Sequence, residues 1–207
     1  MDRRRIGVFG GTFDPVHLGH LILAEQCREQ GRLDAVWFVP AARPPHKVDQ
    51  PLTPFAQRVE MLALALAGNA AFRVEQSEKD RPGPSFTVDT LEELGRQHPD
   101  ADFSLLVGSD TLNELHTWRE PARIVARAAL LVVDRPGFPA LTAERFREEL
   151  HLPEGFPLRV QTVEAPLIHI ASRDLRRRAA EGRSLRYLVP RAVEMYVQEK
   201  RLYRPDA

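Results

Sequence analysis

The fold is decided by one stretch, Gly10-Gly11-Thr12-Phe13-Asp14-Pro15-Val16-His17-Leu18-Gly19-His20, which follows a short apolar run at residues 6–9. Such a run is typical of a buried parallel strand. Gly10 and Gly11 allow a sharp turn and let a ligand approach the backbone closely. Asp14 suits a helix N-cap and Pro15 suits the first helical position, so we expect a helix to begin here.

Two histidines lie at the start of this expected helix. His17 and His20 are expected to share one face of its first turn, where N–H groups and the helix dipole favour an anion. The strand, the glycines, the cap and the histidines together indicate a phosphate site. An H-x-x-H pair can also bind zinc, but no third ligand stands nearby at ligand spacing and Cys27 is the single cysteine. Histidines packed in a core are the other alternative.

The composition narrows the class of protein. The chain has 207 residues, 43% of them hydrophobic and 28% charged, which suits one domain with a proper core. Its 29 basic and 29 acidic residues cancel, so the broad basic field of a nucleic-acid binder is absent. We expect small-molecule partners rather than nucleic acid or membrane. With one cysteine and no long apolar segment at the N-terminus, we expect a cytoplasmic protein.

Apolar runs alternate with amphipathic segments along the rest of the chain. This alternation predicts an α/β fold with a Rossmann-like, mostly parallel sheet and helices on both faces. We expect a single domain over residues 1–207, with a small C-terminal helical part from about residue 165. Strands are expected at 6–9, 35–39, 72–75, 103–107, 129–133 and 159–163, and later helices at 53–66, around 88–94, and at 144–150, 173–182 and 190–202.

Two further loops follow predicted strands and so lie at the edge where parallel sheets bind ligands. The segment Pro44-Pro45-His46-Lys47 places a cation and an imidazole after the second strand. The segment Gly108-Ser109-Asp110 repeats the strand-then-glycine arrangement of the N-terminus. Taken alone, segment 44–47 is also compatible with a solvated loop, and Asp110 is also compatible with a helix cap.

The stretch 10–20 resembles the G-x-F-D-P-x-H-x-G-H signature of the nucleotidylyltransferase superfamily, and its full form resembles bacterial nicotinate-mononucleotide adenylyltransferases. The similarity extends over most of the chain. It includes P-P-H-K at 44–47, S-F-T-V-D-T at 85–90, V-G-S-D at 107–110 with Trp118, and I-A-S-R-D-L-R at 170–176. In the last motif, Ala171 and Arg173 replace the serine and threonine usual in that family.

This resemblance implies adenylyl transfer from ATP, with its Mg²⁺, to nicotinate mononucleotide, giving nicotinate adenine dinucleotide and pyrophosphate in NAD biosynthesis. It implies catalytic roles for His17, His20 and Arg176, and no resident metal. The ATP-binding residues that it implies are Gly10, Gly11, Thr12, Phe13, His17, His20, Gly108, Ile170, Ser172 and Arg176. The implied nicotinate-mononucleotide-binding residues are Thr12, Lys47, Thr87, Asp110 and Trp118.

The residues also allow simpler interpretations. Ser85 or Thr87 can cap the helix around 88–94, Ser172 is a natural N-cap, and Trp118 suits an ordinary core. The arginines at 173 and 176–178 suit a solvated basic face. A sibling transferase acting on phosphopantetheine or nicotinamide mononucleotide would share the first and last motifs, although the pantetheine enzyme usually has threonine at position 17. A non-catalytic nucleotide sensor is a further alternative, against which the H-x-G-H pair argues.

Overall fold

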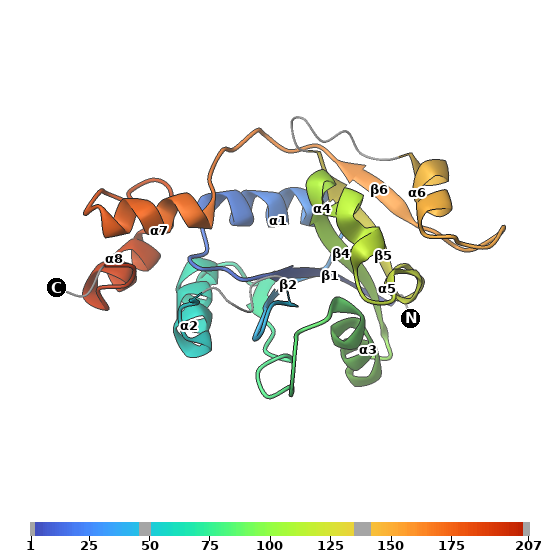
Figure 1. The fold of residues 1–207 in the computed structure, drawn as a ribbon, viewed down its shortest axis with the longest axis horizontal. Coiled ribbons are helices and arrows are strands. Elements are labelled where there is room, and N and C mark those ends of the chain that lie inside the picture. Colours follow the sequence, from blue (N-terminus) through green and yellow to red (C-terminus); the bar gives the residue numbers. More distant parts are fainter. Residues whose placement is uncertain (1–2, 46–50, 135–141, 205–207) are drawn as a thin grey trace.

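A six-stranded sheet with strand order β3-β2-β1-β4-β5-β6 forms the centre of the structure (Figure 1). The computed structural model describes residues 3–45, 51–134 and 142–204. Every neighbouring pair of these strands is parallel, so the predicted Rossmann-like sheet is confirmed. The strands are β1 (Arg4–Gly11), β2 (Ala35–Pro40), β3 (Phe72–Val74), β4 (Ala101–Gly108), β5 (Ala128–Val133) and β6 (Val160–Val163).

Helices connect the strands and cover both faces of the sheet, as parallel connections require. In Figure 1, α1 and α3 lie on opposite sides of the strands, and α7 and α8 lie beside α2 at one end. The helices are α1 (Leu18–Gln30), α2 (Phe55–Leu66), α3 (Thr87–Gln97), α4 (Ser109–Glu114), α5 (Pro121–Arg127), α6 (Ala143–Glu149), α7 (Ser172–Ala180) and α8 (Arg191–Glu199), with a 3₁₀ turn at Leu115–Thr117.

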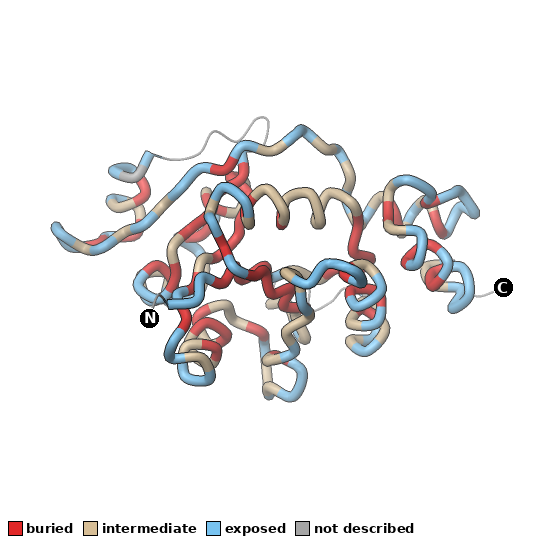
Figure 2. The backbone as a smooth tube through the Cα atoms, turned by 180° about the vertical axis from the view of Figure 1, so that it is seen from behind, coloured by how far each residue is buried: buried red, intermediate tan, exposed pale blue. Residues whose placement is uncertain are grey.

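Each central strand is buried on both faces because its side chains alternate between two hydrophobic cores. In β2, Trp37 belongs to the core under α3 and α5, whereas Phe38 belongs to the core under α1, α2, α7 and α8. Figure 2 shows the buried residues concentrated along the strands and on the helix faces turned toward them. Continuous apolar runs, rather than alternating ones, are therefore the correct strand signal in this chain.

The start of α1 differs from the sequence prediction. The helix begins at Leu18 with His17 as its N-cap residue, so the expected cap at Asp14 and first helical position at Pro15 are wrong. The physical reason is that other groups bind the Asp14 carboxylate: it accepts hydrogen bonds from the Tyr203 hydroxyl and the Thr53 N–H. Residues 12–16 instead form a separate loop between β1 and α1, called here the phosphate loop.

The strand order places β1 and β4 side by side at the point where the sheet reverses its winding direction. In sheets of this type, ligands bind outside the carboxyl ends of the strands at that point. Gly11 ends β1 and Gly108 ends β4. Segment 164–171 then passes along α1 toward α7 (orange in Figure 1) and comes close to the same region. None of the helices in the described parts of the chain is long and apolar enough to cross a membrane.

Candidate active site

A cavity of about 830 Å³ opens at the carboxyl edge of the sheet. Residues at the ends of β1, β2, β4 and β5 line it, and segment 165–171 forms one rim. This is the location that the sheet topology favours for a nucleotide. The sequence-predicted residues that line it are Gly10, Gly11, Thr12, His17, His20, Thr87, Gly108, Asp110, Trp118 and Ile170.

Three of the predicted site residues that the structure describes are not in this lining. Phe13 is buried beneath it, where its ring packs against Phe9 and Phe38. Ser172 and Arg176 lie behind the phosphate loop, and Arg176 lines a second cavity of about 490 Å³ there. Lys47 lies outside the described residues.

The two histidines lie against each other at the start of α1. Their rings are stacked with centroids 3.6 Å apart, and the His17 backbone N–H donates to Nδ1 of His20 over 3.2 Å. Because Nδ1 of His20 accepts this bond, the neutral ring carries its proton on Nε2. The edge-on contact of the His20 ring with Phe13 restrains its orientation. The site therefore holds an oriented N–H donor near the glycines of β1.

Helix α7 is fastened to the phosphate loop by two side chains. The Ser172 hydroxyl donates to the Pro15 carbonyl over 2.9 Å, and Nη1 of Arg176 donates to the Asp14 carbonyl over 2.7 Å. Ala171, not Ser172, is the N-cap of α7, so the predicted capping role of Ser172 is wrong. The serine instead supplies a contact between two segments more than 150 positions apart in the sequence.

The opposite wall of the cavity includes Glu78, which belongs to none of the sequence motifs. This buried carboxylate accepts hydrogen bonds from the Thr90 hydroxyl, over 2.7 Å, and from the Ala42 N–H. The N-cap residue of α3 is Phe86, so the expectation that Ser85 or Thr87 caps this helix is wrong. The Ser85 Oγ instead accepts a hydrogen bond from the Arg43 N–H. These bonds join the loop after β2 to α3. The pattern of local residue types around Glu78 gave no signal of this role, since its partners are distant in sequence.

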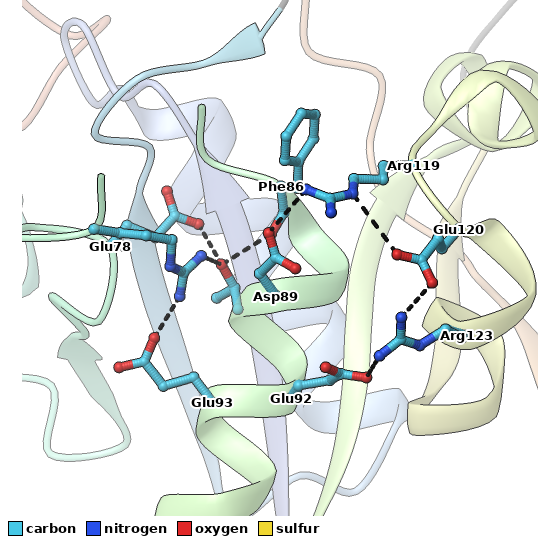
Figure 3. Close-up of polar contacts among 10 residues, drawn as sticks. Glu78, Phe86, Asp89, Glu92, Glu93, Arg119, Glu120 and Arg123 are labelled. Carbon is cyan, nitrogen blue, oxygen red and sulfur yellow. Dashed lines mark hydrogen bonds and ion pairs between the residues drawn. The ribbon is translucent and has the colours of Figure 1, made fainter. Parts of the chain in front are cut away.

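Thr87 and Trp118 face the cavity from neighbouring elements. Thr87 is the first residue of α3. Trp118 packs against the core, as its simpler interpretation expects, and it also lines the cavity, while its stacking on a pyridine ring stays a prediction. Next to them the Arg119 guanidinium lies over the Phe86 ring, 4.8 Å from its centroid, and 3.5 Å from Asp89 (Figure 3). Figure 3 also shows Arg123 paired with Glu92 and Glu120, which ties α5 to α3.

Segment 165–171 forms one rim of the cavity, and Ile170 is the one residue of this segment that was predicted to bind a ligand. Pro166, Leu167, Ile168 and His169 also line the cavity, and His169 is exposed to solvent. The apolar residues just before α7 were the sequence feature that could have indicated this rim. Among the described residues, no group of three or more histidine, cysteine or acidic side chains is arranged to hold a metal ion.

Comparison with known proteins adds independent findings. Residues 8–178 match the cytidylyltransferase-like family. A probable nicotinate-nucleotide adenylyltransferase of Thermomicrobium roseum is 48% identical over 97% of this chain and 92% of its own, and one of Thermus thermophilus is 47% identical over 97% and 100%. The fold is similar to that of Plasmodium falciparum nicotinic acid mononucleotide adenylyltransferase complexed with NaAD, with a TM-score of 0.77, 19% identity and 97% coverage of both chains.

Proposed function

The chain belongs to the cytidylyltransferase-like family, and we propose that it is a nicotinate-nucleotide adenylyltransferase of NAD biosynthesis. A phosphate oxygen of nicotinate mononucleotide attacks the α-phosphorus of Mg²⁺-ATP. The bond from that phosphorus to the β-phosphate oxygen breaks, and pyrophosphate leaves with the electron pair. The observation that carries the proposal is the stacked His17–His20 pair beside the glycine end of β1, in a chain that matches such enzymes over nearly its full length.

The chemistry needs no general base from the protein. A phosphate monoester with a second pKa of about 6 is already largely dianionic at neutral pH, so the nucleophile is present without proton removal. The barrier lies in bringing anions together in line, and positioning and positive charge lower it. We assign this role to His17, His20, Lys47, Arg176 and the Mg²⁺ that ATP carries.

The ATP phosphates are assigned to the β1 edge and the phosphate loop, with Gly10, Gly11, Thr12, Gly108, Ile170 and Ser172 as further contacts. A Cβ on Gly10 would meet no atom within 4 Å, so the space above this residue is open. Gly10→Ala is therefore expected to keep its melting temperature while kcat/KM for ATP falls at least about tenfold, because the methyl group occupies ligand space. Thermal melts and initial rates measure both effects.

Gly95→Ala is the matched control, because Gly95 also has open space around its Cβ position but lies in α3 outside the cavity lining. It is expected to retain wild-type kinetics. If Gly10→Ala were as active as Gly95→Ala, the assignment of the ligand to this part of β1 would be wrong.

The pyridine nucleotide is assigned to Thr87, Asp110 and Trp118, with the ring stacked on the indole. The N-terminus of α3 supplies N–H groups beside Trp118, and such groups pair with a carboxylate but not with the donors of an amide. Each unpaired polar contact costs roughly 1–3 kcal/mol, so nicotinate mononucleotide should be preferred over nicotinamide mononucleotide at least about tenfold in kcat/KM.

Pyrophosphate release from Mg²⁺-ATP, measured with each mononucleotide and with phosphopantetheine in turn, tests this function. Release with nicotinate mononucleotide is expected to be fastest, and Trp118→Ala is expected to raise its KM. Equal efficiency with both mononucleotides would exclude the nicotinate preference and leave adenylyl transfer standing. No release with any acceptor would favour the nucleotide-sensor alternative.

A further inference from the structure

The Asp14 side chain is held from two distant parts of the chain. Its carboxylate is almost completely buried, with 1% of the residue exposed. Oδ1 accepts a 2.7 Å hydrogen bond from the Tyr203 hydroxyl, and Oδ2 accepts one of 3.2 Å from the Thr53 N–H. Burial, and then the Asp14 charge, raise the pKa of Tyr203, so its hydroxyl keeps the proton that it donates.

The backbone of the phosphate loop is held in a similar way. Arg58, which is 1% exposed, donates from Nη1 to the Thr12 carbonyl over 2.8 Å and from Nε to the Thr53 carbonyl over 2.9 Å. Together with the bond from Arg176 to the Asp14 carbonyl, the bond to Thr12 holds the first and third residues of the phosphate loop. The groups that define the shape of the loop thus come from α2, α7 and the C-terminal segment.

Two residues in this arrangement adopt a backbone conformation that non-glycine residues rarely take. Phe13 has φ of 51° in the loop, and Tyr203 has φ of 65° in the C-terminal segment. A residue in this region of φ/ψ space needs surrounding contacts to hold it there. The Tyr203–Asp14 hydrogen bond joins the two segments that contain them.

We propose that Tyr203 is a positioning residue for adenylyl transfer, which acts through Asp14 to hold the phosphate loop in the shape that orients His17 and His20. The proposal rests on the proposed function. Without the hydroxyl, the buried Asp14 carboxylate loses one of its donors, and an unsatisfied buried charge is costly. The carboxylate then competes for the Arg176 guanidinium or turns toward the start of α1. Either change moves the phosphate loop at Asp14, which is only three residues before His17 in the sequence.

Tyr203→Phe removes the hydroxyl and keeps the ring, and Tyr196→Phe is its matched control. Tyr196 also lies in the C-terminal part of the chain and also donates to a carboxylate, that of Glu60, but away from the phosphate loop. We expect Tyr203→Phe to lower kcat about tenfold, with the KM for nicotinate mononucleotide within twofold of wild type. Tyr196→Phe is expected to change the melting temperature about as much as Tyr203→Phe does, but to keep the wild-type kcat.

Two further measurements separate positioning from general destabilisation. If Tyr203 acts through Asp14, its replacement has less effect in an Asp14→Asn background than in the wild type, which a double-mutant cycle detects. Ring-nitrogen NMR signals of His17 and His20 are expected to shift in Tyr203→Phe and not in Tyr196→Phe, whatever reaction the protein catalyses. Unchanged histidine signals, a kcat within twofold of wild type, or an equal loss of kcat in both tyrosine variants would each overturn the proposal.

The NMR measurement also separates a failure of this inference from a failure of the proposed function. A wild-type protein that releases no pyrophosphate contradicts the function, and the histidine signals then still decide whether Tyr203 holds the loop. A wild-type protein that is active, alongside a fully active Tyr203→Phe variant, contradicts the inference alone.

Discussion

Replacement of His20 by alanine is expected to lower kcat about 10²–10³-fold while the protein remains folded, which is the usual effect of removing one preorganised donor from an electrostatic site. The neutral His20 ring carries its proton on Nε2 because Nδ1 accepts the His17 N–H. Contacts with Phe13 and with the stacked His17 ring hold that donor in place before substrate binds. Alanine removes the donor and leaves β1 and the phosphate loop otherwise intact.

Steady-state pyrophosphate release and a thermal melt measure the two parts of this prediction. His151→Asn is a suitable control, because His151 is exposed, lies outside the cavity lining and has a left-handed backbone that asparagine tolerates. Its kcat is expected to equal that of the wild type. A folded His20→Ala protein with near-normal kcat would show that His20 is not the donor to the transferring phosphate.

Replacement of Arg176 by alanine is expected to reduce kcat/KM for ATP by about 10²-fold. The guanidinium has five N–H donors, and the structure uses Nη1 for the Asp14 carbonyl. Truncation removes this anchor of the phosphate loop and, under the proposed assignment, a positive charge that acts on the ATP phosphates. Kinetics at varied Mg²⁺-ATP separate the effect on KM from the effect on kcat.

Two neighbouring arginines provide controls for charge alone. Arg177 is exposed and pairs with Asp174 over 3.1 Å, and Arg178 donates to the Ser184 carbonyl at the surface. Arg177→Ala and Arg178→Ala are expected to stay within about twofold of wild type, as surface pairs of this kind contribute little. Similar losses in all three variants would mean that the basic face of α7 acts only through its overall charge.

The sequence predicted the six strands and most of the helices, though not α5, because that information is local. The run Ala35–Val39 is apolar at every position, and the structure shows it buried on both faces of the sheet. Gly68 lies just after α2 with φ of 89°, a left-handed conformation that glycine commonly adopts after the end of a helix. Motif spacing likewise identified ten of the residues that line the cavity.

The predicted first residues of the helices were often wrong, because capping hydrogen bonds compete with hydrogen bonds to distant parts of the chain. Asp14, Ser85 and Ser172 each have the chemistry of a cap, yet each binds a group outside the helix that follows it. Glu78 is a buried carboxylate whose partners Ala42 and Thr90 lie on other elements, so its local sequence gave no reason to select it. Hydrogen bonds between residues far apart in the sequence do not alter the local hydrophobic periodicity from which elements are predicted.

By itself, then, the sequence determined the parallel sheet and the glycine-histidine edge of the site, because strand burial, backbone freedom at glycine and helical spacing depend on neighbours a few positions away. The tertiary structure decided how that edge is held. Tyr203 meets Asp14 across 189 positions, and Arg176 meets the same residue across 162. Only the folded chain brings these groups together, because a buried polar group is stabilised by whichever partner the packing places beside it.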